Sequence, residues 1–187
     1  MRQAKWYPFS EAGLTLAELL ITVFILAVIT LIGISSYNSR VRYQVLQSAS
    51  TSTADWLDNV RKRAMQQNNT CAVSISASTN TLSAGTTGNL CGSFAPLNLN
   101  ELQRGSATIS FCYLNADPLT ANINCNNQSL SSSVQLFFSP RGSVTTGYVF
   151  TFFNSSGGSP ITCTILLPPA GLIRSGLVSN NSCIAPT

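Results

Sequence analysis

The stretch that decides the fold is residues 13–34, which read GLTLAELLITVFILAVITLIGI. From residue 14 to residue 34 the only ionisable side chain is that of Glu18, and no proline interrupts the run. A helix of this length is about 31 Å long, which matches a bilayer hydrocarbon core of about 30 Å. The stretch therefore predicts a helix that spans a membrane.

Three kinds of segment share such an apolar run: a cleaved signal peptide, a plain membrane anchor and a specialised export signal. A signal peptide has an apolar core of about 7–15 residues and then a cleavage site with small residues. The run here is longer, although residues 33–35 would serve as such a site. Two basic residues precede the run and two follow it, so the positive charges do not orient it.

Glu18 is the informative residue, because a carboxylate one turn inside an apolar helix is costly unless it reaches water or a cation. One explanation places it near the membrane surface, and the other gives it a cationic partner. If the chain were cut after Gly13, Leu14 would carry a new ammonium group four residues before Glu18, on the same helix face. Between staggered copies of the helix the same two groups would neutralise each other in a medium of low dielectric constant.

Residues 13–20, Gly-Leu-Thr-Leu-Ala-Glu-Leu-Leu, resemble the processing site of type IV pilins and pseudopilins. The resemblance implies that a prepilin peptidase removes residues 1–13 as a leader peptide, cutting between Gly13 and Leu14. It implies that Leu14 is then N-methylated. It also implies that Glu18, the fifth mature residue, pairs with the terminal amine during assembly.

Beyond the apolar run the helical periodicity continues. Apolar residues recur at intervals of three, four or seven: Val41, Val45, Ala49, Trp56, Val60 and Ala64. The sequence Asn68-Asn69-Thr70 predicts the stop. We expect one helix over residues 14–67, membrane-spanning over 14–34 and amphipathic over 35–67. The basic run at 61–63 is typical of a solvated helix face, with phosphate binding as the alternative.

From residue 71 the apolar period changes to two. Short segments rich in β-branched and aromatic residues are separated by Gly, Asn, Ser and Pro, and predict strands at 71–77, 107–114, 134–139, 147–153 and 161–167. Residues 139–142, Ser-Pro-Arg-Gly, predict a type I turn between the third and fourth of these. Residues 78–104 and 115–133 read as irregular polar connections. The expected fold class is α+β, with the long N-terminal helix packed on an antiparallel β-sheet head over 68–187.

The cysteines point to disulfides. The chain has six cysteines and no histidine, and no two cysteines have the C-x-x-C spacing of a zinc site. Without histidine or a second base, a catalytic thiol has nothing to activate it. Six cysteines allow 15 pairings, and the sequence does not select among them. Our working hypothesis pairs neighbours along the chain: Cys71 with Cys91, Cys112 with Cys125, and Cys163 with Cys183.

The C-terminal half carries a second resemblance. Phe137-Phe138-Ser139-Pro140-Arg141-Gly142, then Tyr148-Val149-Phe150, then Gly171-Leu172-Ile173-Arg174 are similar to the FimU-like minor pseudopilins of the GspH/FimT family. That likeness implies a pilin fold and a structural subunit with no enzymatic activity, cofactor or metal. The protein would prime or join a type IV pilus, which serves twitching motility and DNA uptake. The alternative is a minor pseudopilin of type II secretion.

The same resemblance implies a location and partners. The chain would cross the bacterial inner membrane once with its head in the periplasm, and reach the filament or its tip after assembly. Its partners would be the prepilin peptidase and the other minor and major pilins or pseudopilins.

DNA is a further partner that the resemblance raises. Some members of the family bind DNA through a Gly-Arg-x-Arg element during natural transformation. Here Leu172 replaces the first arginine, so that Arg174 and Arg141 are the remaining candidates. From residue 68 on, three arginines face two carboxylates, a net charge of +1. Any DNA binding would be weak and salt-sensitive.

The first prediction concerns the mature N-terminus. Mass spectrometry of the protein from its native host should find Leu14 as the first residue, carrying a methyl group. An uncut chain would contradict processing at Gly13. A first residue near Ser36 would instead identify an ordinary secreted domain.

Overall fold

The computed structural model describes residues 15–85, 91, 94–104, 107–115, 123, 125, 133–154 and 161–185, and only the backbone of residues 30–36. The expected leader and Leu14 lie outside these residues. Contacts divide the chain into two units, Met1–Ser39 and Arg40–Thr187. Helix α1 (Leu16–Gln66) contributes to both. Within the described residues, no helix reaches the length and hydropathy that a membrane span requires.

Helix α1 ends at the stop that the sequence predicts. Asn68 has a φ of 49°, in the left-handed region. Its amide donates to the Met65 carbonyl at 3.3 Å, and the Asn69 amide donates to the Ala64 carbonyl at 3.1 Å. These two bonds form a Schellman motif, in which asparagine takes the place usual for glycine. The helix stops here because the next residues satisfy its last carbonyls.

In the second unit, α1 turns its predicted apolar stripe to the interior. Val45, Ala49 and Trp56 are buried, as are Val60 and Ala64 further along. The buried face of the helix is wider than the predicted stripe. It also includes Leu46, Ser50, Thr53 and Leu57.

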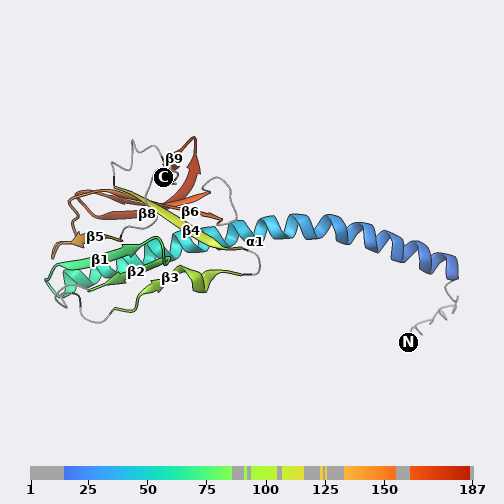
Figure 1. Ribbon diagram of the computed structural model, residues 1–187, viewed down its shortest axis with the longest axis horizontal. Helices are drawn as coiled ribbons and strands as arrows, with labels where there is room; N and C mark the ends of the chain where they lie inside the picture. The colour runs from blue at the N-terminus through green and yellow to red at the C-terminus, as the bar shows by residue number, and fades with distance from the viewer. Residues whose placement is uncertain are drawn as a thin grey trace, which may run out of the picture. The chain divides into compact units, whose positions relative to one another are not determined.

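Two antiparallel sheets make up the rest of this unit (Figure 1). The first contains, in spatial order, β3 (Leu97–Asn98), β2 (Thr81–Ala84), β1 (Cys71–Ser76) and β5 (Ser133–Phe138). The second contains β4 (Ile109–Asn115), β6 (Tyr148–Asn154), β7 (Thr162–Leu167), β8 (Leu172–Ser179) and β9 (Ser182–Ile184). A 3-10 helix, η1 (Leu99–Leu102), follows β3. Since β5 follows β4 in the chain, the polypeptide returns to the first sheet before completing the second.

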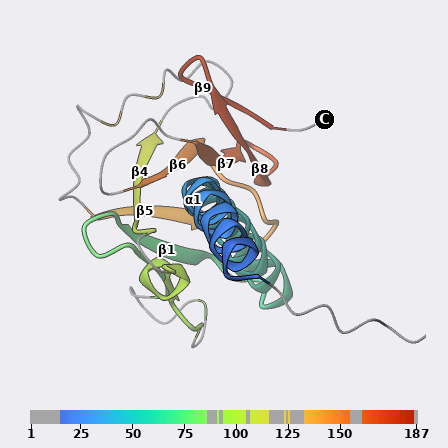
Figure 2. The same cartoon turned by 90° about the vertical axis from the view of Figure 1, so that its right-hand side faces the viewer.

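The main core lies where residues 40–66 of α1 meet both sheets (Figure 2). The second sheet contributes its largest fully buried side chains, Phe111, Phe150 and Phe152. The first sheet contributes Ile75 and Phe138. The core therefore contains side chains from all three layers.

The second sheet is covered on both faces. Its strands alternate, so that Phe150 and Phe152 enter the main core while Val149, the residue before Phe150, faces the other side. There Val149 packs with Ile165 and Ile123 in a smaller cluster. This two-sided burial explains the nearly continuous burial of β6 and β7.

One expectation needs correction and one is confirmed. Residues 78–104 are not irregular throughout, because β2, β3 and η1 lie there. In β2 only Leu82 is fully buried, so the strand has no alternating apolar pattern to reveal it. The predicted turn at 139–142 is present, with the Gly142 amide donating to the Ser139 carbonyl at 2.8 Å. It connects strands of different sheets, since β5 pairs with β1 and β6 pairs with β4.

Three disulfides join cysteines that are neighbours along the chain: Cys71–Cys91, Cys112–Cys125 and Cys163–Cys183. Cys71 and Cys91 are fully buried in the main core. The sulfurs of Cys163 and Cys183 join β7 to β9 across β8, beside the smaller cluster. On β8, Gly176 lies opposite Cys163, and a Cβ there would lie 2.3 Å from the Ile184 carbonyl oxygen.

The second prediction concerns this β7–β9 bond. Replacing Cys163 and Cys183 together by alanine should lower the free energy of unfolding by about 3 kcal/mol, because the bond closes a long loop. Urea unfolding of the full chain in detergent measures the change. Ser179→Ala, an exposed change on β8, is the control and should have no effect. An unchanged midpoint in the double variant would show that β9 packs equally well without the bond.

Candidate functional site

The first candidate site is the start of α1, where Thr15 and Glu18 form a capping box. One Glu18 carboxylate oxygen accepts the Thr15 amide at 2.9 Å and the Thr15 hydroxyl at 2.9 Å. The Thr15 hydroxyl oxygen accepts the Glu18 amide at 3.3 Å. Reciprocal bonds of this kind satisfy helix amides that have no partner within the helix. Glu18 is thus directed toward the first residues of the helix, where the negative charge also suits the helix dipole.

The side chains that follow Glu18 are apolar and exposed. Between residues 16 and 29 the exposed large side chains are Leu16, Leu19, Leu20, Ile21, Val23, Phe24, Ile25, Leu26, Val28 and Ile29. Exposed apolar area of this extent marks a surface that another apolar phase covers. Gly13 and Leu14, the expected processing residues, lie outside the described part of the chain. The structure therefore describes the acidic member of the expected pair alone.

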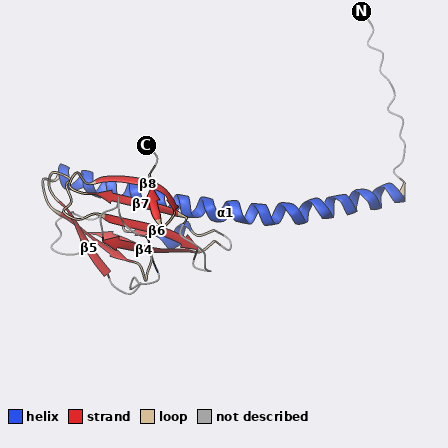
Figure 3. Cartoon of the chain, turned by 90° about the horizontal axis from the view of Figure 1, so that it is seen from above, coloured by secondary structure: helices blue, strands red, loops and turns tan. Residues whose placement is uncertain are grey.

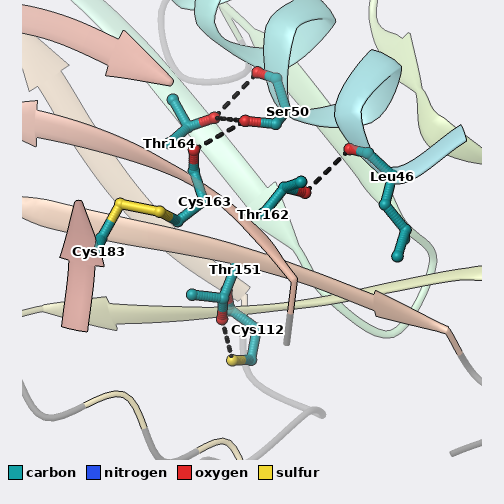
Figure 4. Close-up of a disulfide and its surroundings, with 8 residues drawn as sticks. All are labelled: Leu46, Ser50, Cys112, Thr151, Thr162, Cys163, Thr164 and Cys183. Atoms are coloured by element: carbon teal, nitrogen blue, oxygen red, sulfur yellow. Dashed lines mark hydrogen bonds between the residues drawn. A yellow bond between two sulfur atoms is a disulfide. The ribbon is translucent and has the colours of Figure 1, made fainter. Parts of the chain in front are cut away.

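The second candidate site is the contact of α1 with β7, which we call the helix–β7 seam (Leu46, Ser50, Thr162 and Thr164; Figure 4). The Thr162 hydroxyl donates to the Leu46 carbonyl at 3.0 Å, and the Thr164 hydroxyl donates to the Ser50 carbonyl at 2.9 Å. In the opposite direction, the Ser50 hydroxyl donates to the Cys163 carbonyl at 2.7 Å. The Ser50 and Thr164 hydroxyl oxygens lie 3.0 Å apart.

The seam depends on matched spacings. Four residues along a helix span about 6 Å, and two residues along a strand span about 6.6 Å. Leu46 and Ser50 therefore meet Thr162 and Thr164 in step, with helix and strand running in the same direction. Figure 3 shows β7 and β8 alongside this part of α1. Small side chains allow the approach, because a larger residue at position 50 would separate its backbone from β7.

A third feature lies at the far end of α1. Arg61 is not simply solvated, as the basic run at 61–63 led us to expect. Its Nε donates to the Gly142 carbonyl at 3.0 Å, and its Nη2 donates to the Ala170 carbonyl at 3.2 Å. Asp58, one turn earlier, lies 3.5 Å from Nη1 and 2.7 Å from the Lys62 ammonium. The expectation of a solvated face is wrong for Arg61, because two turns of the head lie within its reach.

The two arginine candidates for DNA binding are both exposed. Arg141 lies in the β5–β6 turn, and Arg174 lies on β8 opposite Ile165 of β7. The turn that contains Arg141 and the turn that precedes Arg174 meet at Gly142 and Gly171, where a Cβ on Gly171 would lie 2.2 Å from the Gly142 carbonyl oxygen. The fold thus brings two distant parts of the sequence to the same end of the head.

Several of these residues were not found from the sequence. Ser50 and the β7 threonines look like surface residues when counted by composition, and nothing local distinguishes Arg61 from its basic neighbours. The capping box did have a signal, because Thr-x-x-Glu before an apolar run is its signature. In the described residues, no three His, Cys, Asp or Glu side chains form a group that could bind a metal.

The architecture and the site define an α+β pilin-type fold, and solved structures share it. No protein-family model and no curated protein matches the sequence. The minor pseudopilin EpsH from the type 2 secretion system of Vibrio cholerae matches with a TM-score of 0.51 and 15% identity, over 75% of this chain and 99% of that one. The type IV minor pilin FimU of Pseudomonas aeruginosa matches with a TM-score of 0.46 and 15% identity, over 74% and 92%.

At 15% identity, these matches show a similar fold and nothing more. The EpsH match covers nearly all of that chain and three quarters of this one. The resemblance to minor pilins and pseudopilins that the sequence indicates is confirmed at the level of the fold. A helix packed on antiparallel sheets, expected from the sequence, is present.

The third prediction tests the helix–β7 seam. Ser50→Ala should lower the free energy of unfolding by about 1–3 kcal/mol, because the buried Cys163 carbonyl and Thr164 hydroxyl lose a partner. Ser48→Ala is the matched control, since Ser48 lies on the exposed side of the same helix turn. Thermal or urea unfolding of the full chain in detergent reports both. Equal stability of the two variants would refute a stabilising role for the seam.

Proposed function

We propose that this protein is a structural subunit of a pilin-type filament, a minor pilin. The single observation that supports this most is the start of α1, where Glu18 is the one charge on a helix segment of exposed apolar side chains. Its carboxylate is directed to the first helical residues by Thr15. The pilin-type fold of the head is consistent with the proposal and does not establish it.

Assembly would then use the carboxylate twice. Before assembly, the capping box with Thr15 gives Glu18 two hydrogen bonds within its own chain. After the cut at Gly13, the methylated amine of Leu14 would be a cation near the helix start of each subunit. In a staggered stack, the Glu18 of one subunit would meet that amine of its neighbour, and a mispositioned helix would leave both charges unpaired. The pair would therefore set the axial step of the filament.

The apolar helix surface would be covered throughout, and close packing between helices would hold the assembled subunits together. Its exposed leucine, isoleucine, valine and phenylalanine side chains would lie in the bacterial inner membrane before assembly and against neighbouring helices afterwards. The head would face the periplasm and contact other minor or major pilins along or at the tip of the filament. The prepilin peptidase would be the first partner, because its cut creates the amine.

Two machines use subunits of this kind, and we favour the type IV pilus. A pseudopilus of type II secretion is the second candidate, supported by the fold likeness to EpsH over nearly its whole length. Deleting the gene in its host distinguishes them. Loss of twitching with normal secretion supports the pilus, and the reverse result supports the pseudopilus.

Binding of DNA is a lesser proposal. Arg141 lies exposed in one of the two turns that meet at one end of the head, and Arg174 lies exposed on β8, which follows the other turn. Two arginines neutralise few phosphates, so they would add a weak and salt-sensitive contact at most.

The fourth prediction separates the charge of Glu18 from its capping role. Glutamine at the third helical position completes a capping box as glutamate does, but it has no charge. Glu18→Gln and Glu18→Ala should both be inserted in the membrane and processed, and both should be nearly absent from sheared filaments. Quantitative immunoblotting of sheared and cell-bound fractions measures this.

The control is Glu101→Ala, which removes an exposed carboxylate of the head and should leave incorporation unchanged. Wild-type amounts of Glu18→Gln in the filaments would show that capping alone matters. The proposed charge pair would then have to be abandoned.

A further inference from the structure

Three segments that are distant in the sequence meet at the end of α1. The β5–β6 turn ends at Gly142, the β7–β8 turn contains Ala170 and Gly171, and Arg61 of α1 donates a hydrogen bond to each turn. We call this contact the Arg61 junction (Arg61, Gly142, Ala170 and Gly171). One turn leaves the first sheet and the other belongs to the second, so the junction ties the helix to both sheets.

The two glycines make the close approach possible. Gly142 has a φ of 73° and Gly171 a φ of 62°, both in the region that disfavours side chains. A Cβ on Gly171 would lie 2.2 Å from the Gly142 carbonyl oxygen. A Cβ on Gly142 would lie 2.9 Å from the Met65 sulfur and 3.1 Å from the Arg61 Nε. The helix side chains and the two turns are thus in direct contact, with no space for a side chain on either glycine.

Backbone hydrogen bonds add a second link between the turns. The Val144 amide donates to the Pro169 carbonyl at 3.1 Å. Within the first turn, the Ser139 amide donates to the Ser143 carbonyl at 2.9 Å. The turns therefore form one hydrogen-bonded body, and Arg61 is its connection to α1.

Arginine is suited to this position in a way that lysine is not. Its planar guanidinium presents donors in fixed, divergent directions, so that Nε and Nη2 bond different carbonyls while Nη1 faces Asp58. A lysine ammonium carries all its donors on one nitrogen, so it would have to lie within reach of both carbonyls at once to replace the separate Nε and Nη2 bonds. The Arg61 side chain is 26% exposed, so most of it is covered by the groups that it contacts.

We infer that Arg61 is the positioning residue that fixes the β5–β6 and β7–β8 turns on α1, and so sets the surface on which Arg141 and Arg174 are exposed. Two of the three head segments that resemble the GspH/FimT family, those at 137–142 and 171–174, meet at this junction. The close contact between Gly142 and Gly171 explains why both positions are glycine. This inference concerns the head alone, and it stands or falls independently of filament assembly.

Hydrogen–deuterium exchange of the full chain in detergent tests it, followed by mass spectrometry of peptides that cover the turns. Arg61→Met keeps the length and apolar stem of the side chain but removes its donors. In this variant the peptides covering residues 139–147 and 168–172 should exchange about tenfold faster, which is the effect of losing hydrogen bonds from a charged donor. Peptides covering β4 should exchange at the wild-type rate.

Two further variants make the outcome decisive. Lys62→Met removes a neighbouring charge and the shorter contact to Asp58 but touches neither turn, so it should behave as wild type. Arg61→Lys keeps the charge and should still accelerate exchange in at least one turn. If Arg61→Met does not fold, Arg61→Lys decides the question alone. Wild-type exchange at both turns, or equal acceleration of the turns and β4, would overturn the inference.

Discussion

The hydrogen bonds between α1 and β7 are the constraint on which the rest of the head depends. Leu46 and Ser50 meet Thr162 and Thr164 in step, because one helical turn and two strand residues have nearly the same length. Apolar packing alone would allow the helix to slide or rotate, since methyl groups make contacts in many positions. A serine bonded to a strand carbonyl has one acceptable position. The hydrophobic core thus favours burial of the helix, and the seam fixes its position along β7 and its rotation about its own axis.

Other contacts of α1 take their places relative to the seam. Further along the helix, the Trp56 indole donates to the Ala95 carbonyl at 2.9 Å, and its ring packs edge-on against Phe94. These contacts attach the connection after β2 to the helix. One turn beyond, Arg61 reaches the two turns. Along its length the helix therefore contacts a strand, a long loop and two turns in succession.

Periodic patterns made much of this fold predictable. The stripe from Val45 to Ala64 and the alternating segments around Phe111, Phe150 and Ile165 follow directly from burial, and the stop at Asn68 follows from asparagine's tolerance of the left-handed region. Polar residues with long-range partners were not predictable. Ser48 and Ser50 are the same residue type in the same helix turn, and they differ in whether a strand of the head lies against them. Arg61 was missed for the same reason. The disulfide pairs of the structure are those of the working hypothesis, although nothing in the sequence excluded the other pairings.

The position of β5 has a consequence for how the chain folds as it is made. Strand β1 pairs on one side with β2, which follows at once, and on the other with β5, as in the pair Val73 and Leu136. A chain that emerges N-terminus first must wait until β4 and the residues after it have appeared before β1 finds its second neighbour. Until then one edge of β1 has no strand beside it, and an unpaired edge invites pairing with other chains. During that interval the unpaired edge of β1 would be a binding site for chaperones.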